Sequence, residues 1–217
     1  EAHRALPLSA AWGDGTTSSS DGQFFRAGGR GEAVGDVNAR HGNEPGVAFY
    51  THVSDQFGPF HTKVIAATAS EAPHVLDGLL RHGTGLRFAE HYTDTGGATD
   101  QVFGLFALLG IRFAPRLRDL KDRRLYAFRG MSVPEAFSGM MGGNIDVEHL
   151  RAHWDEALRL AVSVGSGHVA ASGVLRRLAA YPRQNGLAVA LREIGRLERT
   201  LFTLDWLRSA DLRRRAN

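Results

Sequence analysis

The chain of 217 residues contains no cysteine. Without thiols it can form neither a disulfide framework nor a thiolate metal site, a composition that fits a reducing cytosol. No apolar run approaches the roughly 20 residues that a membrane-spanning helix needs, so we expect no membrane association. The first residues, Glu1 to Arg4, show neither an initiator methionine nor a signal-peptide pattern. We therefore expect an internal part of a longer protein.

What the chain does contain is an ordinary globular composition with an uneven distribution of charge. It is 43% hydrophobic and 23% charged, which suits one large domain with its own core. Residues 1–100 hold 7 Lys and Arg against 12 Asp and Glu, whereas residues 101–217 hold 19 against 11. An acidic half could hold metal ions and a basic half could attract phosphates. Solvated arginine-rich helices would give the same count.

Hydrophobic periodicity divides the chain at about residue 130. Before it, strands are expected at 10–12, 22–27, 47–53, 60–67, 86–92 and 111–114, with helices at 72–82 and 99–109. After it, helices are expected at 146–165, 169–180 and 187–207, with another beginning at 209 and a Gly/Met-rich linker at 139–144. The sequence thus predicts an α/β domain over residues 1–130, a mixed sheet with flanking helices, followed by an all-helical segment over 131–217.

Two aspartates are the first candidates for chemistry. Asp14 and Asp94 each follow an expected strand and precede glycine and hydroxyl residues. In sheets of this kind, sites gather at the carboxyl ends of strands, and hard divalent cations prefer carboxylate oxygens. The alternative is a turn aspartate for Asp14 and a helix cap for Asp94.

Three segments carry a resemblance to a known family. Residues 12–23 (WGDGTTSSSDGQ), 92–95 (YTDT) and 191–196 (LREIGR) resemble the catalytic region of the Tn3-family transposases, and nearly the whole chain runs in that register. The resemblance implies a ribonuclease H-like DDE core that cuts and joins DNA at transposon ends. It implies two Mg²⁺ ions, with Mn²⁺ as a substitute; Asp14 would bridge the two ions and Asp94 would hold one of them.

Other acids receive different roles. Asp21 and Asp100 do not align with the acids of the family, so we expect Asp21 to fix a loop and Asp100 to complement a helix dipole. DDE chemistry needs a third carboxylate, and the resemblance places that glutamate just beyond Asn217. Glu193 and Glu198 are the only internal substitutes. We therefore expect this chain alone to bind metal weakly and not to catalyse.

Basic residues after the last expected strand are the candidate DNA contacts. They are Arg116, Arg118, Lys121, Arg123 and Arg124, and with DNA as substrate they suit the phosphate backbone. A solvated loop is the alternative. A second set, Arg192, Arg196 and Arg199, lies on one side of the long helix, where interleaved glutamates make ion pairing an equal explanation.

The histidines raise a rival site. His52, His61 and His91 lie on or beside expected strands and could join aspartates in a metallohydrolase. No compact metal-ligand spacing is present, so structural roles are favoured.

The resemblance also sets the expected partners and the alternatives. It implies binding to transposon terminal inverted repeats and to target DNA, a homodimer at full length, and action at the nucleoid of the bacterial cytoplasm. One alternative is a ribonuclease H-like metal-dependent nuclease without strand transfer. The other is a catalytically inactive DNA-binding or assembly module, which a stop codon directly after Asn217 would favour.

Overall fold

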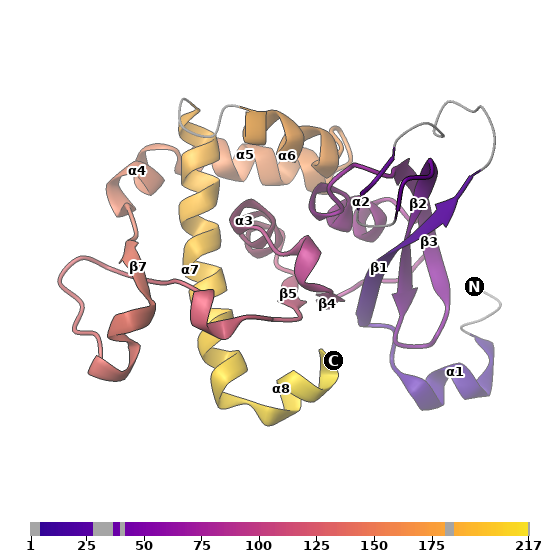
Figure 1. The fold of residues 1–217 in the computed structure, drawn as a ribbon, viewed down its shortest axis with the longest axis horizontal. Coiled ribbons are helices and arrows are strands. Elements are labelled where there is room, and N and C mark those ends of the chain that lie inside the picture. Colours follow the sequence, from indigo (N-terminus) through magenta and orange to yellow (C-terminus); the bar gives the residue numbers. More distant parts are fainter. Residues whose placement is uncertain (1–4, 28–36, 40–41, 181–184, 217) are drawn as a thin grey trace.

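The computed structural model describes residues 5–27, 37–39, 42–180 and 185–216, and its centre is a mixed sheet. The strands are β1 (Thr17–Arg26), β2 (Gly46–Ser54), β3 (Pro59–Ala66), β4 (Glu90–Thr93) and β5 (Arg112–Pro115). Their order is β3-β2-β1-β4-β5 (Figure 1). Strand β1 pairs antiparallel with β2 and parallel with β4, which in turn pairs parallel with β5. The sheet therefore has an antiparallel half, β3-β2-β1, and a parallel half, β1-β4-β5, which share β1.

Helices surround this sheet and form the rest of the molecule. They are α1 (Pro7–Trp12), α2 (Val75–Leu80), α3 (Asp100–Leu108), α4 (Val147–Ala152), α5 (Trp154–Gly165), α6 (Ala171–Ala180), α7 (Gly186–Arg208) and α8 (Ala210–Arg215). Short 3₁₀ turns are η2 (Ala72–His74), η3 (Thr95–Gly97), η4 (Leu120–Asp122) and η5 (Glu135–Met140), and β6 (Leu125–Ala127) pairs with β7 (Met141–Asn144). Among the described residues, no helix combines the length and the apolar character that a membrane span requires.

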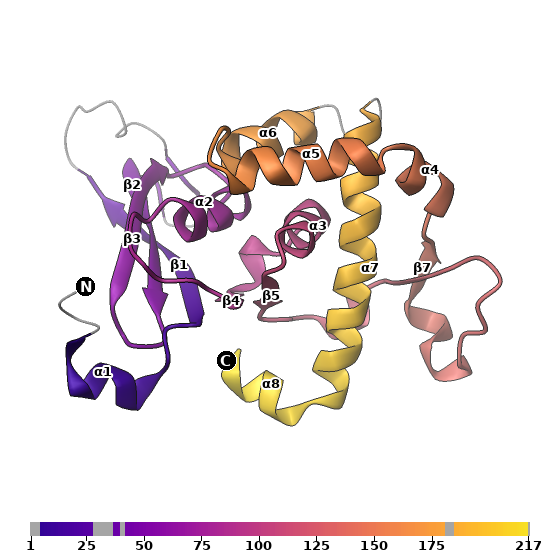
Figure 2. The ribbon, with the colours of Figure 1, turned by 180° about the vertical axis from the view of Figure 1, so that it is seen from behind.

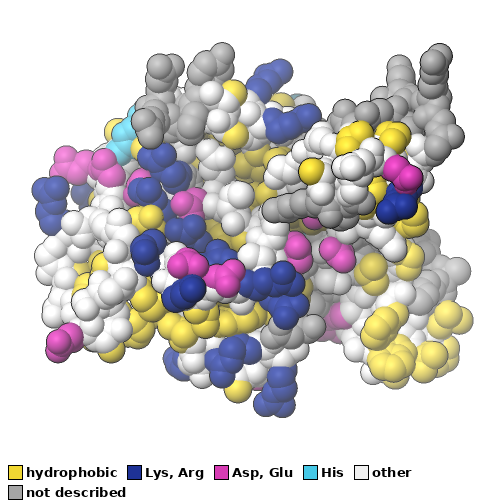
Figure 3. Space-filling view, viewed as in Figure 1, with side chains coloured by type: hydrophobic (Ala, Val, Ile, Leu, Met, Phe, Trp, Pro, Cys, Tyr) yellow, Lys and Arg dark blue, Asp and Glu magenta, His cyan; other side chains and the backbone are white. Residues whose placement is uncertain are grey.

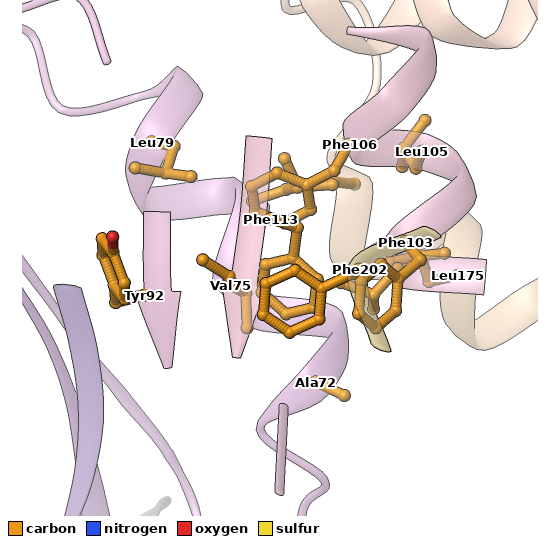
Figure 4. Close-up of a cluster of buried hydrophobic side chains, with 14 of the residues drawn as sticks. Ala72, Val75, Leu79, Tyr92, Phe103, Leu105, Phe106, Phe113, Leu175 and Phe202 are labelled. Atoms are coloured by element: carbon orange, nitrogen blue, oxygen red, sulfur yellow. The ribbon is translucent and has the colours of Figure 1, made fainter. Parts of the chain in front are cut away.

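One hydrophobic core joins the sheet to the helices. Helix α3 lies between β5 and the long helix α7 in both views (Figures 1 and 2). Phe106 of α3 stacks on Phe113 of β5 with ring centroids 4.4 Å apart, and Phe103 meets Phe202 of α7 at 5.8 Å (Figure 4). The buried cluster extends from Ala48 to Leu212. Residues on both sides of position 130 thus share one core, and the division into two domains stays a prediction.

Glycines allow α3 and α7 to approach closely. A methyl group at Gly195 of α7 would overlap the carbonyl oxygen of Asp100, and one at Gly104 of α3 would overlap that of Leu191. Because the obstacle at each position is backbone, a side chain there could be accommodated only by moving a helix. Backbone contact between two helices fixes both their separation and their axial position.

A buried carboxylate ties α2 to its neighbours. Asp77 accepts hydrogen bonds from the Ser172 amide (3.0 Å) and hydroxyl of α6, and from Lys63 Nζ of β3 at 2.9 Å. Burial alone raises the pKa of Asp77, but hydrogen bonds from His74, Ser172 and Lys63 outweigh it and hold the pKa below the ordinary 3.8. The charged form is therefore the one that the fold stabilises.

The predicted α/β class with a mixed sheet is confirmed, and most expected elements are present within a few residues. Two expectations were wrong. The expected strand at 10–12 is helix α1, which begins at a proline, a residue favoured at the first helical position. The expected linker at 139–144 contains β7. In addition, β1 begins at Thr17, five residues before the expected strand. The sequence did not predict these residues as strand because their buried positions are serines, which show no hydrophobic alternation.

We predict that Gly195→Ala lowers the free energy of unfolding by about 1–3 kcal/mol, because the new methyl group pushes α7 from α3. The matched control is Gly173→Ala on α6, where nothing lies within 4 Å of the added Cβ. That variant should gain up to about 1 kcal/mol of helix stability. Urea unfolding monitored by circular dichroism measures both. Equal stability of Gly195→Ala and the parent chain would contradict the close contact.

We predict that Asp77→Asn lowers the stability at pH 7 by about 1–3 kcal/mol, because a neutral amide replaces a hydrogen-bonded buried carboxylate. The folded-state pKa lies below 3.8, so the contribution of the charge is complete above that value and is lost as the pH falls through the folded-state pKa. The difference between variant and parent should therefore shrink in acid. Glu44→Gln, which removes an exposed partner of Arg26, is the control and should change stability by less than about 0.5 kcal/mol. Urea unfolding at pH 7 and at about pH 3 gives the comparison; a difference that stays constant contradicts the assignment.

Candidate active site

A pocket of about 670 Å³ lies on the face of β1 and β4 that points away from α2 and α3. Its lining includes Asp21 of β1, Asp94 after β4, Arg116 after β5 and Arg215 of α8. In both ribbon views the C-terminal end of the described chain lies beside β4 and β5 (Figures 1 and 2). The pocket therefore collects two acids and two arginines from four separate parts of the chain.

The alternation of β1 places Asp21 in this pocket. Successive side chains of a strand point to opposite faces, and Ser18 and Ser20 are buried whereas Ser19 and Asp21 are exposed. Asp21 Oδ1 accepts a hydrogen bond from the Gly22 amide at 2.8 Å. The carboxylate thus projects from the middle of the central strand and is open to solvent.

Asp94 stands beside Asp21 because of the register between the strands. Ser20 pairs with Thr93 in the parallel ladder, so the next position on each strand is an aspartate. Asp94 caps η3, accepting a hydrogen bond from the Gly96 amide at 3.0 Å, and is exposed. Both carboxylates also line a neighbouring pocket of about 300 Å³ together with Glu71. A methyl group at Gly22 would overlap the Glu71 carboxylate, so the glycine after Asp21 lets this acid lie against β1.

A neutral polar layer lies beneath the two acids. His91 of β4 is completely buried, with its Nδ1 2.8 Å from Ser18 Oγ and its Nε2 2.8 Å from Ser20 Oγ. Ser20 Oγ also lies 2.8 Å from the Tyr50 hydroxyl. Burial holds the pKa of His91 well below 6.5. Burial likewise raises the pKa of Tyr50, as do nearby carboxylates that include Asp94. Both groups are therefore uncharged at neutral pH.

Asp14 lies elsewhere. It belongs to the turn before β1, where its Oδ1 accepts hydrogen bonds from the Thr16 amide (2.9 Å) and hydroxyl, which lower its pKa. The Gly15 amide donates to Asp55 at 3.0 Å, which fixes this turn on the β2–β3 hairpin. Asp14 is not among the residues that line the pocket of Asp21 and Asp94. The expectation that a strand delivers Asp14 at its carboxyl end was wrong, because α1 precedes it and β1 follows it.

Comparison with known proteins gives the family. The family model of the Tn3 transposase DDE domain matches residues 1–217, the whole chain. The chain belongs to the Tn3 transposase family.

Its relatives are much longer. The chain is 59% identical over 210 residues to the transposase for transposon Tn501 of Pseudomonas aeruginosa, a match that covers 97% of this chain and 21% of the relative. It is 56% identical to the transposase for transposon Tn21 of Escherichia coli, with the same two coverages. The transposase for transposon Tn1546 of Enterococcus faecium is 45% identical, over 98% of this chain and 22% of the relative.

The five basic residues predicted as DNA contacts of this Tn3-family chain divide into two groups. Arg116 lines the pocket, and its amide donates to Thr93 O at 2.8 Å. Of the other predicted contacts, Arg118, Lys121, Arg123 and Arg124 lie on the following loop outside the pocket lining. There Arg123 Nε and Arg124 Nη1 donate to backbone carbonyls of the same loop. On the face of the molecule shown in Figure 3, Lys and Arg side chains lie in separate patches over the centre and the helical side, interspersed with Asp and Glu.

The second basic set is engaged in ion pairs, one of the two explanations that the sequence left open. Arg196 Nη1 lies 2.6 Å from Glu193, and Arg199 Nη1 lies 2.7 Å from Asp100. Glu193 is buried in this network and also accepts a hydrogen bond from the Asp146 amide. Glu198 lines a different pocket beside Phe103, where burial raises its pKa. Neither glutamate is in the lining of the Asp21 and Asp94 pocket.

Sequence reasoning placed neither Asp21 nor Arg215 in this pocket. No sequence pattern pointed to Asp21, because the two buried positions of β1 that precede it are serines and show no hydrophobic alternation. Arg215 gave no signal, since only the turn between α7 and α8 returns it to the sheet. There Arg215 Nη1 lies 3.2 Å from Glu90 and its Nε lies 3.1 Å from Asp211. The histidine metal site has no support, since the described residues include no group of three or more His, Asp or Glu that could hold a metal.

Proposed function

We propose that this chain is the catalytic region of a DNA transposase and that Asp21, in place of Asp14, acts with Asp94 as its pair of metal-holding acids. The observation that carries the proposal is the parallel register of β1 and β4, which sets the two carboxylates side by side in one open pocket. Membership of the Tn3 family supports the reaction class. The ribonuclease H-like assignment rests on the same family and on a mixed sheet whose central strand and its parallel neighbour carry the acids.

The donor set suits Mg²⁺, or Mn²⁺ in its place. Both carboxylates are exposed and supply hard oxygen ligands, which these cations prefer over nitrogen or sulfur. When bound between such acids, divalent ions activate the attacking oxygen and stabilise the leaving oxygen of a phosphodiester. Asp21 and Asp94 would hold them. Two carboxylates are fewer than DDE chemistry needs, so we propose that a glutamate beyond Asn217 completes the set.

The remaining residues suggest how DNA is held. Arg116 and Arg215 border the acids and would bind phosphates on either side of the bond that reacts. Water first cuts the strand at the transposon end and leaves a 3′-hydroxyl. That hydroxyl then attacks a target phosphodiester, so that one P–O bond forms as another breaks. No covalent protein–DNA intermediate is required. The homodimer and the location at the nucleoid stay predictions of the family resemblance.

We predict that Asp21→Asn or Asp94→Asn lowers strand cleavage by the full-length transposase at least ~100-fold, because each variant removes a charged metal ligand. Asp14→Asn is the matched control: it makes the same change seven residues from Asp21, outside the pocket, and should retain most of the activity. Cleavage of a DNA substrate that carries a transposon end, with strand joining measured in the same reaction, gives the comparison. Loss of cleavage in Asp14→Asn with full activity in Asp21→Asn would reverse the assignment. Cleavage without joining in the parent protein would favour a nuclease.

We predict that Arg116→Ala weakens DNA binding. The slope of log affinity against log salt is negative, and its magnitude should fall by about 1, the value expected for one lost phosphate contact. Arg87→Ala is the control, since Arg87 is exposed beside a different pocket. Fluorescence anisotropy of labelled DNA at several salt concentrations measures both. An unchanged slope in Arg116→Ala would show that its guanidinium does not contact phosphate.

A further inference from the structure

A single buried imidazole bridges the two strands that carry the aspartates. His91 lies on β4, three residues before Asp94, and none of its surface is exposed. Its two ring nitrogens each lie 2.8 Å from a serine hydroxyl on β1, one from Ser18 and the other from Ser20. Ser20 directly precedes Asp21. The ring therefore uses all of its hydrogen-bonding capacity on the strand that holds the other acid.

The ring is also fixed on its two faces. His52 of β2 stacks on it with centroids 5.6 Å apart, and Phe106 of α3 stacks at 5.9 Å. The network continues from Ser20 to the Tyr50 hydroxyl on β2, so hydrogen bonds cross three neighbouring strands. A side chain held in this way has little freedom to follow β1 if that strand moves.

The spacing of the two serines makes the contact specific for one register. The parallel ladder pairs Ser18 with His91 and Ser20 with Thr93. A slip of one residue would turn Ser19 and Asp21 toward the buried side and remove both hydrogen bonds. A slip of two residues would leave only one serine within reach. The buried positions of β1 beside the ring, Ser18 and Ser20, carry no aliphatic side chain. Burial of apolar surface by these two residues therefore does not set the register of β1 against β4.

We propose that His91 is a positioning residue that fixes the register of β1 against β4 and thereby holds Asp21 beside Asp94. The inference rests on the proposed metal role of these aspartates. The imidazole contacts neither metal nor DNA. An incorrect register would leave the buried serine hydroxyls and ring nitrogens without hydrogen-bond partners. The free-energy cost of these unpaired groups exceeds the net stabilisation that the hydrogen bonds give in the correct register, so the imidazole favours that register.

The first test is His91→Phe. Phenylalanine keeps the ring packing on Phe106 and removes both hydrogen bonds to β1. The matched control is His52→Phe, which replaces an equally buried ring whose hydrogen bond runs to Val75 O at 2.9 Å and not to β1. Two quantities are measured on the 217-residue chain: Mn²⁺ affinity by electron paramagnetic resonance, and hydrogen exchange of the amides at 17–21 and 90–93. His91→Phe should lower the affinity about tenfold and accelerate exchange at these amides, while His52→Phe changes neither at these strands.

A second variant keeps the test decisive if His91→Phe does not fold. Ser18→Ala combined with Ser20→Ala removes the same two hydrogen bonds, together with that between Ser20 and Tyr50, and leaves the imidazole in place, so it should reproduce both effects. Parent-like exchange at 17–21 and 90–93 in either folded variant overturns the inference, whatever the metal result.

The aspartate variants separate this failure from that of the proposed function. If Asp21→Asn and Asp94→Asn bind Mn²⁺ as the parent does, the metal site is wrong, whereas the exchange measurement still decides whether His91 sets the register. If they lose Mn²⁺ and His91→Phe does not, the metal site stands and the role of His91 is wrong.

Discussion

The parallel pairing of β1 with β4 is the constraint on which the candidate site depends. Each strand supplies one aspartate, and neither acid is positioned by contact with the other. Asp21 is held by the alternation of β1, and Asp94 by the end of β4 and the 3₁₀ turn that it caps. The distance between the carboxylates is therefore set by backbone register. A polar layer beneath the strands, made of serine, histidine and tyrosine, satisfies itself by hydrogen bonds.

That layer differs in kind from the core beside it. Between α3, α5, α6 and α7 the buried residues are mainly aliphatic and aromatic. Apart from the backbone contact at Gly104 and Gly195, such apolar packing stabilises the fold without strongly selecting one alignment of the backbone. Hydrogen bonds are directional, so an imidazole between two serines accepts one arrangement and penalises the rest. The hydrophobic core thus contributes most of the stability, whereas the polar layer contributes the alignment of β1 with β4 that a two-acid site needs.

The same division explains what could be predicted from the sequence. Segments with strong hydrophobic periodicity, such as α3 and α7, appear within about one residue of their expected bounds. Asp94 directly follows β4, as expected, and its metal role stays a prediction. Asp21 was assigned to a loop because Ser18 and Ser20 do not look like buried positions, and only their tertiary contact with His91 makes them so. The position of Asp21 beside Asp94 could therefore not be predicted from local sequence pattern. Asp14, with glycines on both sides, resembled the end of a strand, but helix α1 precedes it in the structure.

The close contact between α3 and α7 has a consequence at the opposite end of the long helix. Gly195 lies 13 residues from Arg208, the last residue of α7, a distance of roughly 20 Å along the axis. A tilt of about 5° at the glycine contact would move that end by roughly 2 Å over this length. Helix α8 continues from there and carries Arg215 to the pocket. The position of this guanidinium beside the aspartates is thus governed by the angle of α7, and a small repacking within the core would change the pocket while leaving the fold intact.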